Sequence, residues 1–135
     1  MKKLANQQSG SLGETLALAK INSLSLPAYV TPEGAPGHDL IVICDGIAKS
    51  IEVKTRQYFE RPTEISRWPV NMATKGDADF FLFVELNLGT MTSCFYLLNN
   101  EQAKEIYRDD KSGGNCPPAQ VRLRVEANNF DAPLN

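Results

Sequence analysis

Two acidic residues and one lysine, on neighbouring stretches of the chain, are the residues best suited to chemistry. Asp39 comes just before the apolar run 40–43, and Glu52 and Lys54 end a second run that begins at Ile47. Carboxylates are hard oxygen ligands for a divalent cation, and an ammonium group beside them offsets the negative charge of a phosphate. The combination is typical of metal-assisted phosphodiester hydrolysis.

The elements that position these residues are predicted to be the two strands of a β-hairpin. Asp45 and Gly46 lie between the two runs, and Asp-Gly favours a two-residue turn because both positions need a positive φ. Residues equidistant from the turn are then partners, so Asp39 faces Glu52 with Cβ atoms roughly 4.5–5.5 Å apart. Side chains alternate along a strand, so Lys54 shares the face of Glu52. The opposite, core-facing side carries Leu40, Val42, Ile51 and Val53.

Two carboxylates directly opposite each other destabilise a strand pair unless a cation or a shared proton lies between them. The arrangement therefore favours a metal site at Asp39 and Glu52. The alternative is that Asp39, Glu52 and Lys54 are exposed residues of an amphipathic hairpin, with Lys54 neutralising its neighbours. An acid-x-Lys triplet is weak evidence alone, since Asp109 to Lys111 also fits it without an apolar strand around it.

The order of these features resembles the PD-(D/E)XK, or restriction-endonuclease-like, nucleases. Members carry an acid at the start of one strand, an acid-x-Lys on the next, and often a glutamate on the preceding helix. Asp39, Glu52, Lys54 and Glu14 match these positions. The resemblance extends over residues 9–107, through a Gly-Glu helix, the hairpin with its EVKT ending, and the ADFFLFV and FYLL strands. The proline of the family name is absent here.

The resemblance implies a role for each residue. Asp39 and Glu52, together with the backbone carbonyl of Val53, would hold Mg²⁺ or Mn²⁺, and Glu14 would complete the metal shell. The ion would acidify a water molecule and neutralise the phosphate, and Lys54 would orient the attacking water. Glu14 also has a second interpretation, because Ser11 to Glu14 reads as a capping box that begins a helix.

Nucleic-acid contacts are predicted from cationic and aromatic residues that follow the hairpin. The formal net charge is −2, with 14 Lys and Arg against 16 Asp and Glu, which is low for an autonomous DNA-binding protein. Basic residues nevertheless cluster locally, and Trp68 could stack on a base or anchor the segment to the core. The candidate contacts are Lys49, Arg56, Arg61, Arg67, Trp68 and Lys75.

The remaining pattern predicts a single α/β domain over residues 1–135, with a restriction-endonuclease-like core of mixed β-sheet flanked by helices. Helices are expected at 9–26 and 100–107, and strands at 28–31, 78–86, 94–98 and 121–125. Residues 109–118 are expected to form a loop, and residues 1–8 and 127–135 flexible ends. His38 should face away from Asp39 and have a structural role.

Composition limits the function further. No apolar run is long enough to span a membrane, and the N-terminal residues do not form a signal-peptide core, so we expect a cytoplasmic protein. The three cysteines, Cys44, Cys94 and Cys116, are expected to be reduced thiols.

The sequence therefore predicts an Mg²⁺-dependent DNA endonuclease. Cutting both strands needs two sites, which is compatible with a homodimer. The alternative is a non-catalytic module of the same fold that binds nucleic acid or a protein partner, and a partner protein is also one source of DNA recognition for the enzyme.

Overall fold

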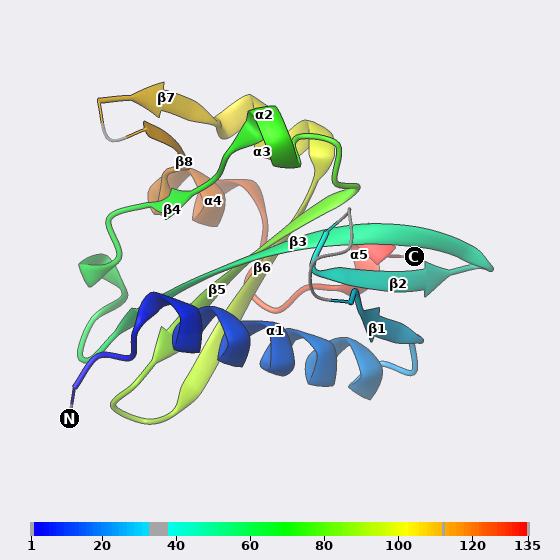
Figure 1. Ribbon diagram of the computed structural model, residues 1–135, viewed down its shortest axis with the longest axis horizontal. Coiled ribbons are helices and arrows are strands. Elements are labelled where there is room, and N and C mark those ends of the chain that lie inside the picture. The colour runs from blue at the N-terminus through cyan, green and yellow to red at the C-terminus, as the bar shows by residue number, and fades with distance from the viewer. Residues whose placement is uncertain (1, 33–37, 112, 135) are drawn as a thin grey trace.

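The computed structural model describes residues 2–32, 38–111 and 113–134. Its centre is a five-stranded mixed sheet in the order β1-β2-β3-β5-β6 (Figure 1). All neighbouring pairs are antiparallel except β3 and β5, which are parallel. The strands are β1 (Ala28–Val30), β2 (Leu40–Cys44), β3 (Ile47–Tyr58), β5 (Phe80–Asn87) and β6 (Thr92–Asn99).

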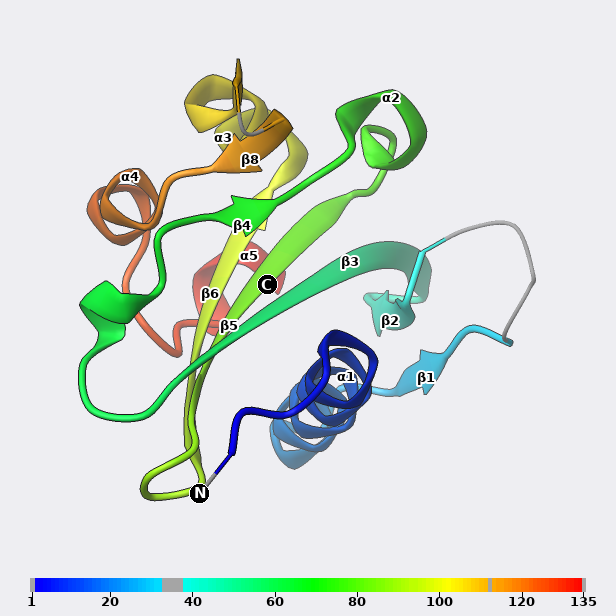
Figure 2. The same cartoon turned by 60° about the vertical axis from the view of Figure 1, so that its left-hand side comes forward.

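Each face of this sheet is covered by a different layer (Figure 2). One face packs against α1 (Asn6–Ser23) and the short C-terminal helix α5 (Asp131–Leu134). The other face is covered by a small sheet in the order β4-β8-β7 and by short helices. These elements are η1 (Pro62–Glu64), β4 (Trp68–Pro69), α2 (Met72–Lys75), α3 (Asn100–Ile106), β7 (Arg108–Asp110), β8 (Gly113–Cys116) and α4 (Pro118–Arg124).

The predicted hairpin is present with the predicted register. Leu40 pairs with Ile51 and Cys44 pairs with Ile47, and Asp45 and Gly46 form the turn with φ values of 50° and 77°. Both values are positive, as a two-residue turn of this kind requires. Pairing between β2 and β3 ends at Leu40, whereas β3 continues to Tyr58, so Arg56 and Gln57 belong to the strand.

The hydrophobic core lies on both sides of β5. Alternate residues of that strand face the two layers, Leu82 and Val84 on the α1 side and Phe81 and Phe83 on the other. A strand buried on both faces reads as a continuous apolar run, which explains why this strand and its partner β6 were predicted correctly. The core-facing residues predicted for the hairpin, Leu40, Val42, Ile51 and Val53, are buried on the α1 side.

Helix α1 begins earlier than predicted and approaches the sheet along a row of mostly small residues. The buried positions are Ser9, Gly13, Ala17 and Ile21, which repeat every four residues and therefore share one face. The helix begins at Asn6, so Ser11 is in its interior and does not cap it. This corrects the capping-box interpretation of Glu14, which lies in the middle of the helix.

Two expectations for the last third of the chain need correction. Residues 121–125 were expected to be a strand, but α4 spans Pro118–Arg124, because Pro118 favours a helix start and Val121 packs inside. Residues 109–118 were expected to form a loop, but they contain β7 and β8. Near the ends of the chain, Leu4 exchanges two hydrogen bonds with the Gln57 side chain, and Phe130 is buried. Residues 1 and 135 lie outside the described part of the chain.

No helix in residues 2–32, 38–111 and 113–134 has both the length and the apolar character needed to cross a membrane.

Candidate functional site

The site forms where β2 stops and β3 continues. Asp39 immediately precedes β2, and its Oδ2 accepts a hydrogen bond from the Val53 N–H at 2.8 Å. The N–H and C=O groups of a strand residue point to the same side, so the Val53 carbonyl also faces the edge of β3 that β2 leaves uncovered. Asp39 therefore lies beside the part of β3 that β2 leaves uncovered. We call this place the notch, and groups from both layers can meet there.

Glu52 is buried, with only 2% of its side chain exposed, and side-chain nitrogen atoms of Lys54, His38 and Lys75 surround it. Its Oε2 lies 3.3 Å from Lys54 Nζ, and its Oε1 lies 3.2 Å from His38 Nδ1 and 4.0 Å from Lys75 Nζ. An ionised carboxylate is costly to bury unless it is paired and hydrogen-bonded. This arrangement differs from the expectation that the acids stand outside the core, since the small sheet and helix layer covers the second face.

Glu14 reaches the same notch from α1. Its carboxyl group hydrogen-bonds with Asp39, and the charges of Glu52 and Lys54 act on it. Burial raises the pKa of Glu14 to about 7, with the hydrogen bond to Asp39 and the negative charges of Asp39 and Glu52 acting in the same direction and Lys54 acting against them. A proton shared by two carboxyl groups relieves the repulsion that a cation would otherwise relieve.

Glu14, Asp39, Glu52 and Lys54 are thus brought together. The donors are hard oxygens of the kind that Mg²⁺ prefers, so their chemistry fits such an ion. Within residues 2–32, 38–111 and 113–134, however, no three His, Cys, Asp or Glu side chains are grouped tightly enough to hold one ion. To hold such an ion, Glu14 would have to give up the hydrogen bond with Asp39, and the carboxylates would have to exchange hydrogen-bond partners for the metal.

His38 is part of this cluster, which corrects the expectation that it faces away from Asp39. It is buried, with Nδ1 at Glu52 and Nε2 at 2.8 Å from Asp77 Oδ1. The alternation rule failed because His38 and Asp39 precede the regular part of β2. Lys75 was predicted as a DNA contact, and its 4.0 Å approach to Glu52 also brings it to the site. Asp77 was not anticipated, and only the tertiary fold brings it to His38.

Lys54 also borders a cavity of about 610 Å³ between β3 and the small sheet. The other walls come from the β4–α2 segment, from Tyr107 and Asp109, and from Gly114 in β8. The Lys54 side chain is 30% exposed, so its ammonium is both paired with Glu52 and accessible from solvent. This is the open space next to the acidic cluster.

The predicted nucleic-acid contacts do not form one surface. Arg56 and Arg67 line a second cavity together, whereas Lys49 lies by the hairpin end and Arg61 is exposed beside η1. Trp68 is fully buried, packs on Phe83 with ring centroids 5.2 Å apart, and donates its indole N–H to the Val84 carbonyl. The prediction that Trp68 contacts nucleic acid is therefore wrong, and the alternative that it anchors its segment is correct.

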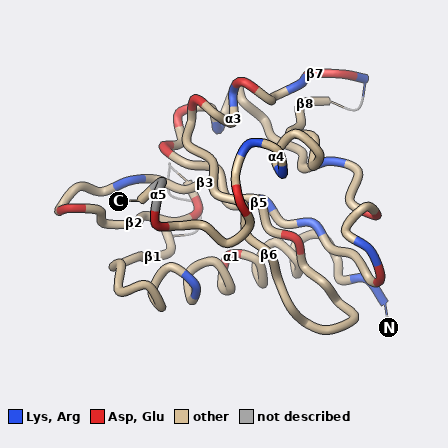
Figure 3. The backbone as a smooth tube through the Cα atoms, turned by 180° about the vertical axis from the view of Figure 1, so that it is seen from behind, with Lys and Arg blue, Asp and Glu red and all other residues tan. Residues whose placement is uncertain are grey.

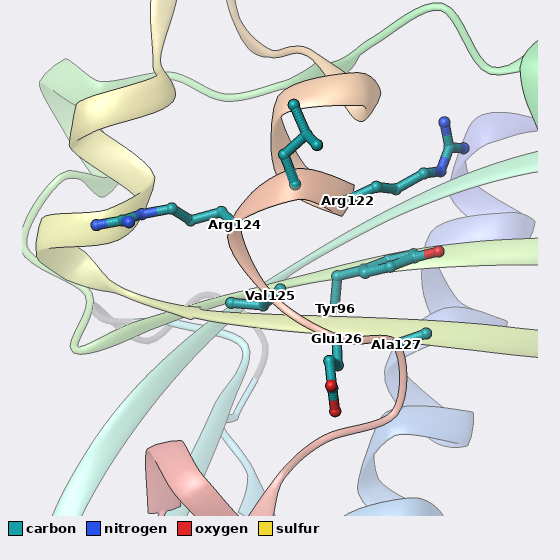
Figure 4. Close-up of a pocket in the computed structure, with 7 residues that line it drawn as sticks. Tyr96, Arg122, Arg124, Val125, Glu126 and Ala127 are labelled. Carbon is teal, nitrogen blue, oxygen red and sulfur yellow. The ribbon is translucent and has the colours of Figure 1, made fainter.

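A third cavity, of about 390 Å³, lies along α4 and the segment after it (Figure 4). Arg122 and Arg124 extend in different directions from this helix; Arg122 pairs with buried Glu85 at 2.8 Å, and Arg124 pairs with Glu105. Burial raises the pKa of Tyr96 to about 12, and the hydrogen bond with Glu85 acts in the same direction. These contacts neutralise Glu85, and we assign the cluster a structural role.

Comparison with known proteins bears on the fold. No protein-family model matches the sequence, and no curated protein matches it. Among solved structures, the chain is similar to the bacterial homing endonuclease I-Ssp6803I, with a TM-score of 0.55 and 14% identity over 73% of this chain and 68% of the other. At this identity the likeness concerns the fold. The protein therefore shares the fold of that endonuclease over the matched part of the chain, a mixed sheet flanked by helices.

Proposed function

We propose that the protein is a metal-dependent DNA endonuclease of the PD-(D/E)XK type, with Asp39, Glu52, Lys54 and Glu14 as its site. One observation carries the proposal: three carboxyl groups and a lysine from α1, the residue before β2, and β3 meet in one notch beside an open cavity. The likeness to a homing endonuclease supports a nuclease-like fold for this arrangement.

The proposed division of labour follows from the chemistry of each group. Asp39, Glu52, the Val53 carbonyl and Glu14 would hold Mg²⁺ or Mn²⁺, whose charge would neutralise the phosphate and acidify a water molecule. Lys54 lies 3.3 Å from Glu52 and borders the cavity, so its ammonium can hold the attacking water and offset negative charge on the phosphate.

His38 and Lys75 have a positioning role in this proposal. Both contact Glu52 Oε1, and His38 is itself held by Asp77. Side chains that restrain a ligand from outside keep its oxygens oriented, which is a common requirement of metal sites. Replacing His38 should therefore weaken metal binding without removing a ligand.

The competing function is a non-catalytic module that binds nucleic acid or a protein partner. The observation that favours it is that Glu52 is already paired with Lys54 and His38, together with a net charge of −2. A second copy of the chain, or a partner that supplies DNA recognition, is compatible with either function.

A cleavage assay separates the two. Supercoiled plasmid and single-stranded DNA are incubated with the protein in Mg²⁺, Mn²⁺ or EDTA, and the products are resolved by gel electrophoresis. We expect metal-dependent cleavage that falls by about 10²–10³ in Lys54→Ala, the usual effect of removing one electrostatic stabiliser, and that is lost in Glu52→Ala.

The matched control is Lys104→Ala, since Lys104 is an exposed lysine of α3 that lines none of the three cavities described above. This variant should cut like the wild type. A pure, folded protein that leaves every DNA and RNA substrate intact in both metals would refute the enzymatic proposal in favour of the binding module.

A further inference from the structure

The cavity next to Lys54 has the size and the mixed lining of a site for a small organic group. Its volume is about 610 Å³, and ligand sites commonly measure about 300–1,000 Å³. One part of the wall is apolar and comes from Pro69, Val70 and Ala73 in the β4–α2 segment. The other part is polar, so a ligand can be held by shape and oriented by hydrogen bonds.

The charged groups at this cavity are balanced, which disfavours an anion inside it. Lys54 supplies a positive charge that Glu52 already shares, and Asp109 of β7 supplies a negative one. Within the described part of the chain, Asp109 forms no ion pair. Figure 3 shows acidic and basic residues next to each other along β7. A phosphate that passed Lys54 would be repelled by Asp109, whereas a neutral group with hydrogen-bond donors would not.

The Tyr107 hydroxyl is a polar group of the cavity that the fold leaves unused. It forms no hydrogen bond with any described residue. Its position depends on Gly114 of β8, because a Cβ atom there would lie 2.0 Å from this hydroxyl oxygen and 2.6 Å from the Val70 carbonyl oxygen. A side chain at residue 114 would therefore take the place of the hydroxyl, and glycine keeps that place open.

Asn71 adds a hydrogen-bond donor to the same cavity. Its Oδ1 accepts a hydrogen bond from the Ala73 N–H at 3.1 Å, which fixes the orientation of the amide. The amide NH₂ group has no partner among the described residues. The cavity thus presents the NH₂ donor of Asn71, the carboxylate acceptor of Asp109 and a hydroxyl that acts as either.

The position of the cavity relative to the proposed active site indicates which organic group would enter. In the proposed function the reacting phosphate lies at Lys54, and Lys54 also lines the cavity. In a nucleotide, a base lies one sugar away from the phosphate. A nucleobase is flat and neutral, and its edge carries both donors and acceptors. It must leave the base stack to enter a protein cavity, which costs least where the base is unpaired.

We infer that this cavity, which we call the base pocket (Pro69, Val70, Asn71, Tyr107, Asp109 and Gly114), holds an unstacked nucleobase beside the phosphate at Lys54. The inference rests on the proposed function and names its substrate class, DNA with an unpaired nucleotide at the site of cleavage. An ionised carboxylate only accepts hydrogen bonds, so Asp109 selects bases that carry an exocyclic amine, such as cytosine.

Binding is measured by fluorescence anisotropy with the full chain in EDTA at pH 8 and low salt, so that metal-dependent cleavage does not intervene. The probes are single-stranded oligo(dC) and oligo(dU), because cytosine has an amine where uracil has a carbonyl. We expect oligo(dC) to bind about tenfold more tightly, as one hydrogen bond to a charged group implies. Asp109→Asn should lose this preference, since an amide can accept from cytosine or donate to uracil.

Two matched pairs of variants separate the pocket from general effects. Glu101→Gln removes an exposed negative charge on α3, as Asp109→Asn does on β7, and should keep the preference for oligo(dC). Tyr107→Phe should weaken binding of oligo(dC) about fivefold, the usual effect of losing one neutral hydrogen bond. Tyr29→Phe, at an exposed tyrosine that lines none of the three cavities, should bind like the wild type. The Tyr107 hydroxyl has no described partner, so its removal should leave the urea midpoint unchanged.

Equal affinity of the wild type for oligo(dC) and oligo(dU), or a preference that survives in Asp109→Asn, would overturn the inference. So would free deoxycytidine monophosphate that binds as tightly as oligo(dC), because the pocket would then serve a free nucleotide. The proposed function is scored separately. Metal-dependent cleavage without any effect of Asp109→Asn or Tyr107→Phe on binding rejects the base pocket alone. An Asp109-dependent preference without cleavage in Mg²⁺ or Mn²⁺ rejects the enzyme alone.

Discussion

Replacing Gly13 by alanine tests the close approach of α1 to β3, on which the position of Glu14 depends. A Cβ atom at residue 13 would lie 1.7 Å from Thr55 Oγ1, 2.7 Å from Thr55 Cβ and 2.9 Å from Thr55 Cγ2. Rotating the Thr55 side chain relieves the first contact, but its Cβ is fixed to the strand backbone. The helix or the strand must therefore move.

The expected size follows from two opposing effects. Overpacking a well-packed contact costs about 1–3 kcal/mol, and we take the upper value because three atoms are too close. Alanine is better than glycine in a helix by about 1 kcal/mol. Gly13→Ala should therefore lower the free energy of unfolding by about 2 kcal/mol, which for a chain of this length corresponds to a fall in Tm of about 8 °C.

Gly10→Ala in the same helix is the matched control. Among the described residues, no heavy atom outside the local helix lies within 4 Å of a Cβ at position 10. Only the helix propensity acts there, so this variant should gain about 1 kcal/mol. Both variants are measured by urea denaturation followed by far-UV circular dichroism. Equal stabilisation of the two variants would refute the packing of α1 on Thr55 and, with it, the position of Glu14.

Three further predictions concern other contacts. Arg122→Met should lower stability by about 2–3 kcal/mol at pH 8, because it leaves Glu85 buried and unpaired, although Arg122 is partly exposed. Arg124→Met, which breaks an exposed pair with Glu105, should cost less than about 1 kcal/mol; equal losses in urea titrations would contradict this account of Glu85. Because the folded pKa of Glu14 is raised from 4.5 to about 7, the native state holds a proton that the unfolded chain releases, so the contribution of Glu14 to stability falls as pH rises through that window. In EDTA, Glu14→Gln should therefore stabilise the protein more at pH 8 than at pH 5, and Tm differences independent of pH would exclude the shift. His38→Ala should weaken Mn²⁺ binding, measured by calorimetry, without abolishing it, and unchanged affinity would exclude its positioning role.

Local chemistry made the hairpin predictable from the sequence. The Asp45-Gly46 turn and the period-two pattern determine the register, and the register brings Asp39 to the uncovered edge of β3 near Glu52. The buried run in β5 was equally clear, because it is apolar at nearly every position. These features depend on residues close together in the chain.

The sequence-based predictions were wrong for features that tertiary packing determines. The Ser11 to Glu14 pattern resembles a helix start, but α1 begins at Asn6. The small residue Gly13 is needed in this helix because it lies against Thr55 of β3. The contacts of His38 with Glu52 and Asp77 join residues far apart in sequence, and no local pattern encodes them. The burial of Trp68 depends on a layer over the second face of the sheet that short, irregular segments form.

The most direct test of the metal site is isothermal titration of the metal-free protein with Mn²⁺ near pH 6.5, in buffers of different ionisation enthalpy, for the wild type and Asp39→Asn. We predict one Mn²⁺ per chain, proton release as Glu14 loses its shared proton, and loss of both in the isosteric variant. Absence of Mn²⁺ binding, or binding that Asp39→Asn leaves unchanged, would contradict the assignment of this notch as the metal centre of a nuclease.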